Sequence, residues 1–386
     1  MNFTEPDHIR QLRETLGRFI DREMPRVAAG RWDRDNHFPR EVFRKLADLG
    51  MMGLTVPEEY GGTGRDILAT MVTIEELSRR SLAVSVPYIM ATCYAGMNIE
   101  ECATEEQKRE LLPRVVDGSL IFAYGWTEPD VGADLASVKT RAERFGDTLR
   151  INGAKRFCSG AAIADYIYAL VRTGPEEARY RNLSLVLIPP TAKGVSISTI
   201  DGLGMKGAAT TDVTFEDVEV PFANVIGGEE GWNDGWRMIV GAGLDVEKLE
   251  VAAIAVGIAR AALDDAWEYA LERRQFGKTI SNYQSIQHKL ANMKTRLHAS
   301  RLMLYHAAWL ANSRTRCGVE TSMTKLFATE AAKYIALESQ TVFGAYGYVK
   351  DFDTERYVRD ALLLPIIGGS SAVQRNNIFK WSGGHA

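Results

Sequence analysis

One acidic side chain, Glu247, occupies a position suited to proton transfer. In the helix predicted over 245–273, Val251, Ile254 and Ile258 follow it at +4, +7 and +11, so all three project within about 40° of its direction. A carboxylate on such an apolar stripe should be desolvated, which raises its pKa. A general base that works near neutral pH needs such a pKa. The alternative is that Glu247 only pairs with a cation or favours the start of its helix.

The cysteines and histidines do not form a metal-binding pattern. The chain has four cysteines and six histidines, with no C-x-x-C pair and no neighbouring His at a metal spacing. We therefore predict no metal site. Four reduced thiols are expected, as in a reducing compartment: Cys93, Cys102, Cys158 and Cys317.

The charge balance excludes one class of partner. Lys and Arg total 46 against 50 Asp and Glu, a net charge of −4 over 386 residues, so no basic excess attracts nucleic acid. The first residues lack the apolar segment of a signal peptide, and the longest purely apolar stretch, 251–259, is too short to cross a bilayer. We expect a cytoplasmic protein without a membrane partner.

Hydrophobic periodicity divides the chain into an α, a β and a second α part. Helical spacing dominates residues 1–120, with helices expected over 7–23, 40–49, 68–79, 84–100 and 104–117. Thr104 and Gln107 have the spacing of a capping box at the start of the last of these.

Period-two patterns and frequent turn signals fill residues 121–225, where Asn152-Gly153 predicts a hairpin turn. Short strands of this kind favour a small barrel or sandwich. Residues 226–386 return to long helices, which favour a four-helix bundle. The predicted fold class is therefore α+β with three domains: an N-terminal helical domain over 1–120, a β-domain over 121–225 and a C-terminal bundle over 226–386.

Four blocks along the chain carry a signature. They read Y-G-W-T-E-P-D-V-G-A-D over 124–134, N-G-A-K-R-F-C-S over 152–159, E-R-R-Q-F-G-K over 272–278, and G-A-Y-G-Y over 344–348 followed by R-D at 359–360. In order and spacing they resemble the acyl-CoA dehydrogenase family, whose first block reads Y-x-V-T-E-P-x-A-G-S-D. Because the blocks cover nearly the whole chain, the resemblance is specific, whereas a lone T-E-P would be weak.

The resemblance implies FAD as the cofactor. A flavin ring needs an aromatic or apolar wall and donors aimed at its pyrimidine oxygens. Two neighbouring β-segments offer that combination in Trp126, Thr127, Phe157 and Ser159. Tyr124 opens the first block, Ala133 replaces the family's usual Ser, and Ser370 keeps a hydroxyl in a Thr position. The alternative for such residues is routine packing of a β-domain.

A second group is implied to contact the cofactor from another subunit. The residue that matches Arg273 binds the flavin pyrophosphate across an interface in the family, a contact suited to the guanidinium fork, and Phe276 lies in the same block. Gln284 and Gly344 match positions near the adenosine half. The resemblance therefore implies a homo-oligomer, a dimer or a tetramer. Without it, Arg273 could simply complement the C-terminus of its helix.

The chain departs from the family at its usual catalytic base. The family's Y-E-G-T-x-E-I-Q becomes I-G-G-S-S-A-V-Q, which places Gly368 where that Glu is expected. The run L-D-V-E-K over 244–248 is similar to the family's L-D-x-E-R, whose Glu is the base in the isovaleryl and long-chain branches. The resemblance thus assigns the base to Glu247, and it places Asp245 and Lys248 close to an acyl-CoA.

These features predict FAD-dependent α,β-dehydrogenation of an acyl-CoA thioester. Glu247 removes the α-proton, the β-hydride passes to flavin N5, and an electron-transfer flavoprotein takes the electrons. A backbone N–H and a flavin ribitol hydroxyl polarise the carbonyl. The same fold could instead act on a carrier-protein thioester or work as an oxygenase. It could also work as an enoyl-CoA reductase, since a glycine at the position of Gly368 resembles crotonobetainyl-CoA reductase-type members. A non-catalytic flavin- or CoA-binding protein is a further alternative. The sequence does not predict which acyl group is the substrate.

Overall fold

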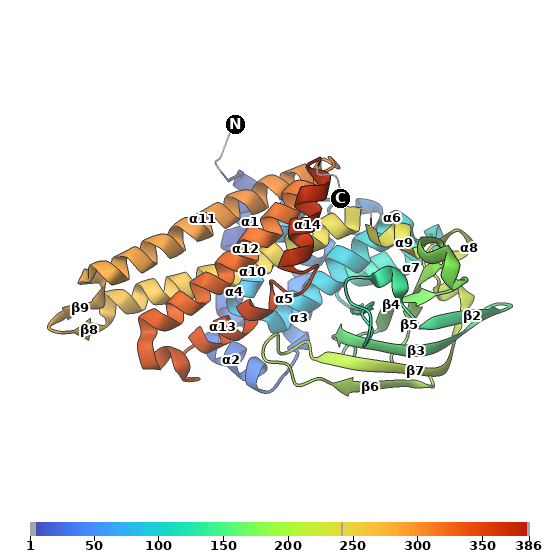
Figure 1. The fold of residues 1–386 in the computed structure, drawn as a ribbon, viewed down its shortest axis with the longest axis horizontal. Helices are drawn as coiled ribbons and strands as arrows, with labels where there is room; N and C mark the ends of the chain where they lie inside the picture. Colours follow the sequence, from blue (N-terminus) through green and yellow to red (C-terminus); the bar gives the residue numbers. More distant parts are fainter. Residues whose placement is uncertain (1–4, 241, 384–386) are drawn as a thin grey trace.

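The computed structural model describes residues 5–240 and 242–383, and it has the predicted order of α, β and α parts (Figure 1). The N-terminal part is helical. Its helices are α1 (Asp7–Glu23), α2 (Arg26–Arg34), α3 (Arg40–Asp48), α4 (Ile67–Arg80), α5 (Leu82–Ile89), α6 (Met97–Cys102) and α7 (Glu105–Val116). The capping box is confirmed, because Gln107 N–H donates to Thr104 Oγ1 and Thr104 N–H to Gln107 Oε1.

The helix predicted over 84–100 is wrong as one element. A π-helical turn, η3 (Met90–Gly96), separates α5 from α6. Such turns are rare and occur frequently at functional sites. By length and composition the run Leu82–Cys102 could cross a bilayer, but all of the stretch tested is buried inside the fold, as in a core helix.

The central part is one seven-stranded sheet. Its strands are β1 (Phe122–Gly125), β2 (Arg141–Phe145), β3 (Thr148–Ser159), β4 (Tyr166–Arg172), β5 (Leu183–Ile188), β6 (Val195–Thr199) and β7 (Thr210–Pro221). The order is β1-β4-β2-β3-β7-β6, with β5 also paired to β4. The pairs of β4 with β1 and β2 are parallel and the others antiparallel.

The hairpin turn predicted at Asn152-Gly153 is wrong. The two residues lie inside β3, where the pairing with β7 shifts register. The Asn152 amide donates to Asp217 Oδ1 at 3.0 Å and accepts from Asp217 N–H at 2.8 Å. Gly153 has φ +144°, and a Cβ there would lie 2.6 Å from Thr140 Cα. The glycine therefore allows a β-bulge in β3, where the backbone passes close to Thr140.

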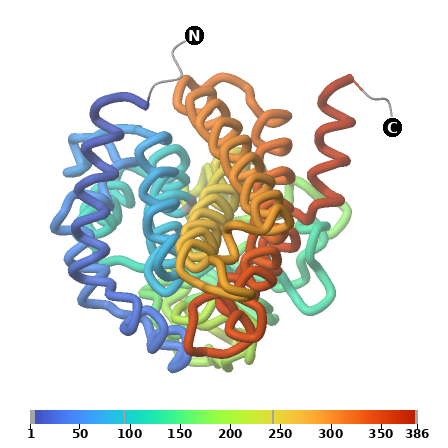
Figure 2. Tube along the Cα trace, turned by 90° about the vertical axis from the view of Figure 1, so that its left-hand side faces the viewer, coloured from blue at the N-terminus to red at the C-terminus, as the bar shows by residue number. Residues whose placement is uncertain are grey.

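The C-terminal part is built on three long helices that run alongside one another, α10 (Ala242–Glu272), α11 (Gln284–Asn312) and α12 (Gly318–Phe343) (Figure 1). The other elements are α8 (Gly228–Gly231), α9 (Gly235–Val240), β8 (Arg274–Gln275), β9 (Lys278–Thr279), α13 (Thr354–Leu363) and α14 (Ser371–Trp381). The N-terminal helix α4 packs against α10 and α11, so the two helical parts lie side by side (Figure 2). The domain boundaries 1–120, 121–225 and 226–386 stay predictions.

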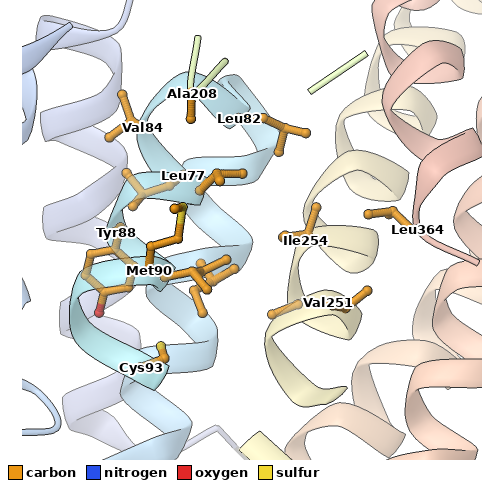
Figure 3. Packing of buried hydrophobic residues seen from close by; sticks show 14 of the residues in the cluster. Leu77, Leu82, Val84, Tyr88, Met90, Cys93, Ala208, Val251, Ile254 and Leu364 are labelled. Carbon is orange, nitrogen blue, oxygen red and sulfur yellow. The ribbon is translucent and has the colours of Figure 1, made fainter. Parts of the chain in front are cut away.

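The η3 turn joins all three parts. Tyr124 of β1 donates its hydroxyl proton to Met90 O at 3.2 Å and accepts from Ala95 N–H at 3.1 Å. On its other side η3 packs against α10 (Figure 3), with Met90 and Cys93 opposite Val251 and other apolar residues of that helix. The four cysteines are free, three of them buried, as predicted. The π-helical turn thus connects the sheet to the helix that carries Glu247.

Candidate active site

Glu247 and Gly368 converge. Gly368 adopts φ +57°, and a Cβ built on it would lie 4.0 Å from Glu247 Oε1 and 3.0 Å from Val251 Cγ2. Two positions 121 residues apart (368 − 247) therefore meet at one point between α10 and the turn before α14. A carboxylate on α10 reaches the place where a side chain at 368 would begin.

The surroundings of Glu247 favour proton transfer. The side chain is half-buried and makes no hydrogen bond within the described ranges 5–240 and 242–383. Burial raises the pKa of Glu247 to about 7, although the charges of Lys248 and Lys325 act in the opposite direction. Its apolar neighbours on the helix, Val251 and Ile254, are 6 % and 4 % exposed. The desolvation expected from the apolar stripe is present.

A rigid glycine turn lies beside the carboxyl. Gln374 Nε2 donates to Gly368 O at 3.0 Å and to Gly369 O at 2.9 Å, and Lys325 Nζ donates to Gly369 O at 2.8 Å. No acceptor for the Gly368 N–H is found in the part of the chain that the structure describes. A fixed N–H beside a carboxylate can hold a carbonyl oxygen on which negative charge develops. Ser370 ends the turn by capping α14, since Val373 N–H donates to its Oγ at 3.4 Å.

Asp245 and Lys248 pair with each other on the same helix end. Lys248 Nζ donates to Asp245 Oδ1 at 2.9 Å and to Thr321 Oγ1 at 3.4 Å. It also lies 4.7 Å from the ring centroid of Trp381. The ammonium is 2 % exposed, so it contributes a fixed positive charge close to Glu247.

The predicted flavin-contacting residues of β1 and β3 lie next to one another. Tyr124 stacks on Trp126 with ring centroids 5.3 Å apart and an interplanar angle of 13°. The N–H of Arg156 donates to Thr127 O at 2.8 Å, which ties the two segments together. Ala133 lies in the exposed turn that follows.

Phe157 and Ser159 complete this group. Phe157 has φ +57° and a side chain that is 56 % exposed, although its strand lies in the sheet. Ser159 Oγ lies 3.3 Å from Thr210 Oγ1. A Cβ at the next residue, Gly160, would lie 3.0 Å from Met90 Cε, so the strand end abuts η3. An exposed ring beside hydroxyl groups is an arrangement that a flat conjugated cofactor fits.

The other four predicted cofactor residues lie at the far end of α10. From Glu247 to Arg273 the helix rises through 26 residues (273 − 247), roughly 39 Å. Phe276, which is 94 % exposed, forms the tip of the β8–β9 hairpin opposite the sheet (Figure 1). Gln284 begins α11, and Gly344 ends α12 with φ +63°. One chain does not bring these residues to Glu247.

Comparison with known proteins identifies the family. Sequence models of the acyl-CoA dehydrogenase N-terminal, middle and C-terminal domains match residues 6–119, 123–218 and 233–383. The chain belongs to the acyl-CoA dehydrogenase family. It is therefore an oxidoreductase, and the predicted α+β class with a central β part is confirmed.

Acyl-CoA dehydrogenase relatives resemble the chain over nearly its full length. An acyl-CoA dehydrogenase of Bacillus subtilis (strain 168) is 37 % identical over 92 % of both chains. The caffeyl-CoA reductase-Etf complex subunit CarC of Acetobacterium woodii is 32 % identical over 97 % of both. The structure of a glutaryl-CoA dehydrogenase in complex with glutaryl-CoA has a TM-score of 0.93 at 33 % identity, covering 98 % of this chain and 95 % of that one.

Sequence reasoning missed a buried ion pair that joins two of the family blocks. Glu128 Oε1 accepts from Lys155 Nζ at 2.8 Å and from Thr140 N–H at 2.9 Å, and Oε2 accepts from Lys139 N–H at 2.6 Å. Burial alone would raise the pKa of Glu128, but Lys155 and these hydrogen bonds lower it. Both residues belong to quoted motifs, yet no spacing rule pairs them.

Sequence reasoning also missed Lys325, which is fully buried on α12 close to Glu247. Its burial lowers the pKa of Lys325 to about 8. The sequence around Lys325, which mixes apolar and hydroxyl residues, carries no pattern that singles this lysine out. Within the described residues, no group of three or more His, Cys, Asp or Glu could hold a metal ion.

Proposed function

We propose that the protein is an FAD-dependent dehydrogenase of acyl-CoA thioesters in which Glu247 is the base. The observation that carries the proposal is the convergence of Glu247 on the Gly368 position. The family's usual base belongs at 368, and here the neighbouring carboxylate is half-buried, lacks a hydrogen bond among the described residues and has a pKa of about 7.

In this mechanism the chain holds the thioester and moves one proton. The Gly368 N–H donates to the thioester oxygen, which acidifies the α-carbon. The ionised Glu247 then takes the α-proton and becomes neutral, while Lys325 and Lys248 stabilise its charged form beforehand. Trp126, Thr127, Phe157 and Ser159 would hold the flavin ring. Bound FAD supplies the acceptor for the β-hydride.

A second copy of the chain is part of this proposal. The separation of roughly 39 Å along α10 prevents Arg273, Phe276, Gln284 and Gly344 from serving the cofactor beside Glu247 of their own chain. The exposure of Phe276 supports their contact with a neighbouring subunit. We also propose an electron-transfer flavoprotein as the electron acceptor, supported by the similarity to a reductase-Etf complex subunit. A cytoplasmic location rests on the sequence alone.

The reverse reaction is the second candidate. Similarity to the caffeyl-CoA reductase-Etf complex subunit favours reduction of an enoyl thioester. In that direction a protonated Glu247 would donate its proton to the α-carbon. The same residues would hold the thioester, because a catalyst acts on both directions of one reaction.

The test uses the purified full-length protein loaded with FAD and kept free of oxygen. Saturated acyl-CoA thioesters should bleach the flavin absorbance and yield enoyl-CoA by mass spectrometry. Reoxidation of the reduced enzyme by enoyl-CoA would favour the reductase, rapid reoxidation by O₂ would favour an oxygenase, and activity only with protein-bound pantetheine would favour a carrier protein. The absence of bound FAD, or bound FAD that no thioester changes, would refute the proposed function.

A further inference from the structure

A second carboxyl lies one turn beyond Glu247 on α10. Glu250 is 2 % exposed, and its Oε1 has no hydrogen-bond partner among the described residues. Its hydrogen-bonding neighbour is the Cys93 thiol of η3, and the charge that raises its pKa is that of Glu247. A thiol is a weak donor, so most of the hydrogen-bonding capacity of this carboxyl is unused.

Two other buried carboxylates of the same fold form ion pairs. Glu75 and Glu76 on α4 are 0 % and 1 % exposed. Arg13 and Arg260 form ion pairs with both. Unpaired buried polar groups cost stability and are rare in folded proteins. An apolar side chain at this buried position would leave no polar group without a partner. The carboxyl therefore fits a role in contacting a ligand.

Burial raises the pKa of Glu250 well above its usual range, and the neighbouring Glu247 acts in the same direction. Both effects favour the protonated form of the carboxyl over the ionised form. The protonated form can donate a hydrogen bond to an oxygen of a ligand, which an ionised carboxylate cannot do.

The direction of the acyl group follows from burial along α10. The carrier half of a thioester has to reach solvent, and the half-buried side chains of Leu244, Asp245 and Glu247 mark the accessible end of the helix. Glu250 and the Cys93 thiol of η3 lie deeper in the fold, so an acyl tail that starts beside Glu247 would extend towards them. Residues three apart on a helix lie about 5–6 Å apart, which is roughly three or four carbon atoms of an extended chain.

We propose that Glu250 selects acyl groups that carry an uncharged oxygen, a hydroxyl or a carbonyl, roughly three or four carbons beyond the α-carbon. The inference rests on the proposed function and names the substrate class of that site. A carboxylate at this place would be repelled by the ionised Glu247. A plain alkyl chain would leave Glu250 Oε1 without a partner.

The test compares matched thioesters on the FAD-loaded full-length protein. The wild-type protein should reduce its flavin with 5-oxohexanoyl-CoA or 5-hydroxyhexanoyl-CoA at a kcat/KM roughly two- to tenfold above that for hexanoyl-CoA, which is the worth of one hydrogen bond. Glu250→Leu should abolish or reverse this ratio, and Glu250→Gln, whose amide still donates, should retain most of it. Glu268→Leu, at an exposed position of the same helix, should leave the ratio unchanged.

Several outcomes would overturn the inference. A wild-type preference for hexanoyl-CoA contradicts the role of Glu250, and so does an unchanged ratio of the two kcat/KM values in Glu250→Leu. Neither result contradicts the proposed dehydrogenation. A preference for 5-aminopentanoyl-CoA or glutaryl-CoA contradicts the uncharged class. If Glu250→Leu fails to fold, the wild-type ratio still decides. If no thioester binds or reduces the flavin, the proposed function itself fails, and the inference falls with it.

Discussion

Glu128, which follows β1, and Glu247 on α10 are both accompanied by a buried lysine, yet their pKa values move in opposite directions. Burial acts in the same sense on both carboxyls. Lys155 and two backbone N–H groups donate directly to Glu128, and they lower its pKa. Lys325 instead donates to Gly369 O, and the pKa of Glu247 rises to about 7. Direct hydrogen bonds thus hold one carboxylate in its charged form, and their absence leaves the other able to exchange a proton near neutral pH.

The largest expected effect concerns the structural pair. Lys155→Met leaves Glu128 buried without its cation, so the free energy of unfolding should fall by about 3–5 kcal/mol. Urea unfolding followed by tryptophan fluorescence measures the change. Lys139→Met is the matched control, because its own pair with Asp130 is exposed and should contribute little. Equal losses in both variants would remove the distinction between the two carboxylates.

The reactive carboxylate should appear in the pH profile of the enzyme. Glu247 accepts a proton only when ionised, so kcat/KM should fall as the pH decreases below its pKa of about 7. The fall approaches about tenfold per pH unit. Steady-state rates with one acyl-CoA, over the range in which the protein stays folded, give the profile. A break near the ordinary value of 4.5 would show that Glu247 is not tuned by burial.

Lys325 should have a smaller effect on the pH at which kcat/KM begins to fall, which is called the break. Its charge lowers the pKa of Glu247, so Lys325→Met should move the break upward by about half to one pH unit. Lys333→Met on the same helix is the control, since Lys333 pairs with Glu330 near the surface. An unchanged break in Lys325→Met would mean that the electrostatic contribution of this lysine is negligible.

Much of the fold followed from local pattern. The helix over 7–23 has the predicted bounds, because an amphipathic helix depends on residues close in sequence. The failures are local patterns that tertiary contacts override. Asn152-Gly153 became a bulge through its pairing with Asp217, and the predicted helix over 84–100 is interrupted by η3.

The candidate site divides in the same way. Glu247 could be selected from its apolar stripe and Gly368 from the family resemblance. Their approach, the pairing of Glu128 with Lys155 and the isolation of Glu250 depend on segments far apart in the chain. The distance between Glu247 and Arg273 could be computed from helix length once both lay on one helix. A contact of Arg273 with another subunit cannot be derived from the sequence or the structure of one chain.

The most direct test of the account measures exchange of the substrate α-proton in Glu247→Gln. With a saturated acyl-CoA in D₂O, the wild-type protein should exchange the α-proton, and the variant should do so about 10²- to 10⁴-fold more slowly. The variant should keep its bound FAD, because the residues proposed to hold the flavin ring lie on β3 and directly after β1, whereas Glu247 lies on α10. Exchange at the wild-type rate in a variant that retains FAD would contradict the assignment of Glu247 as the base.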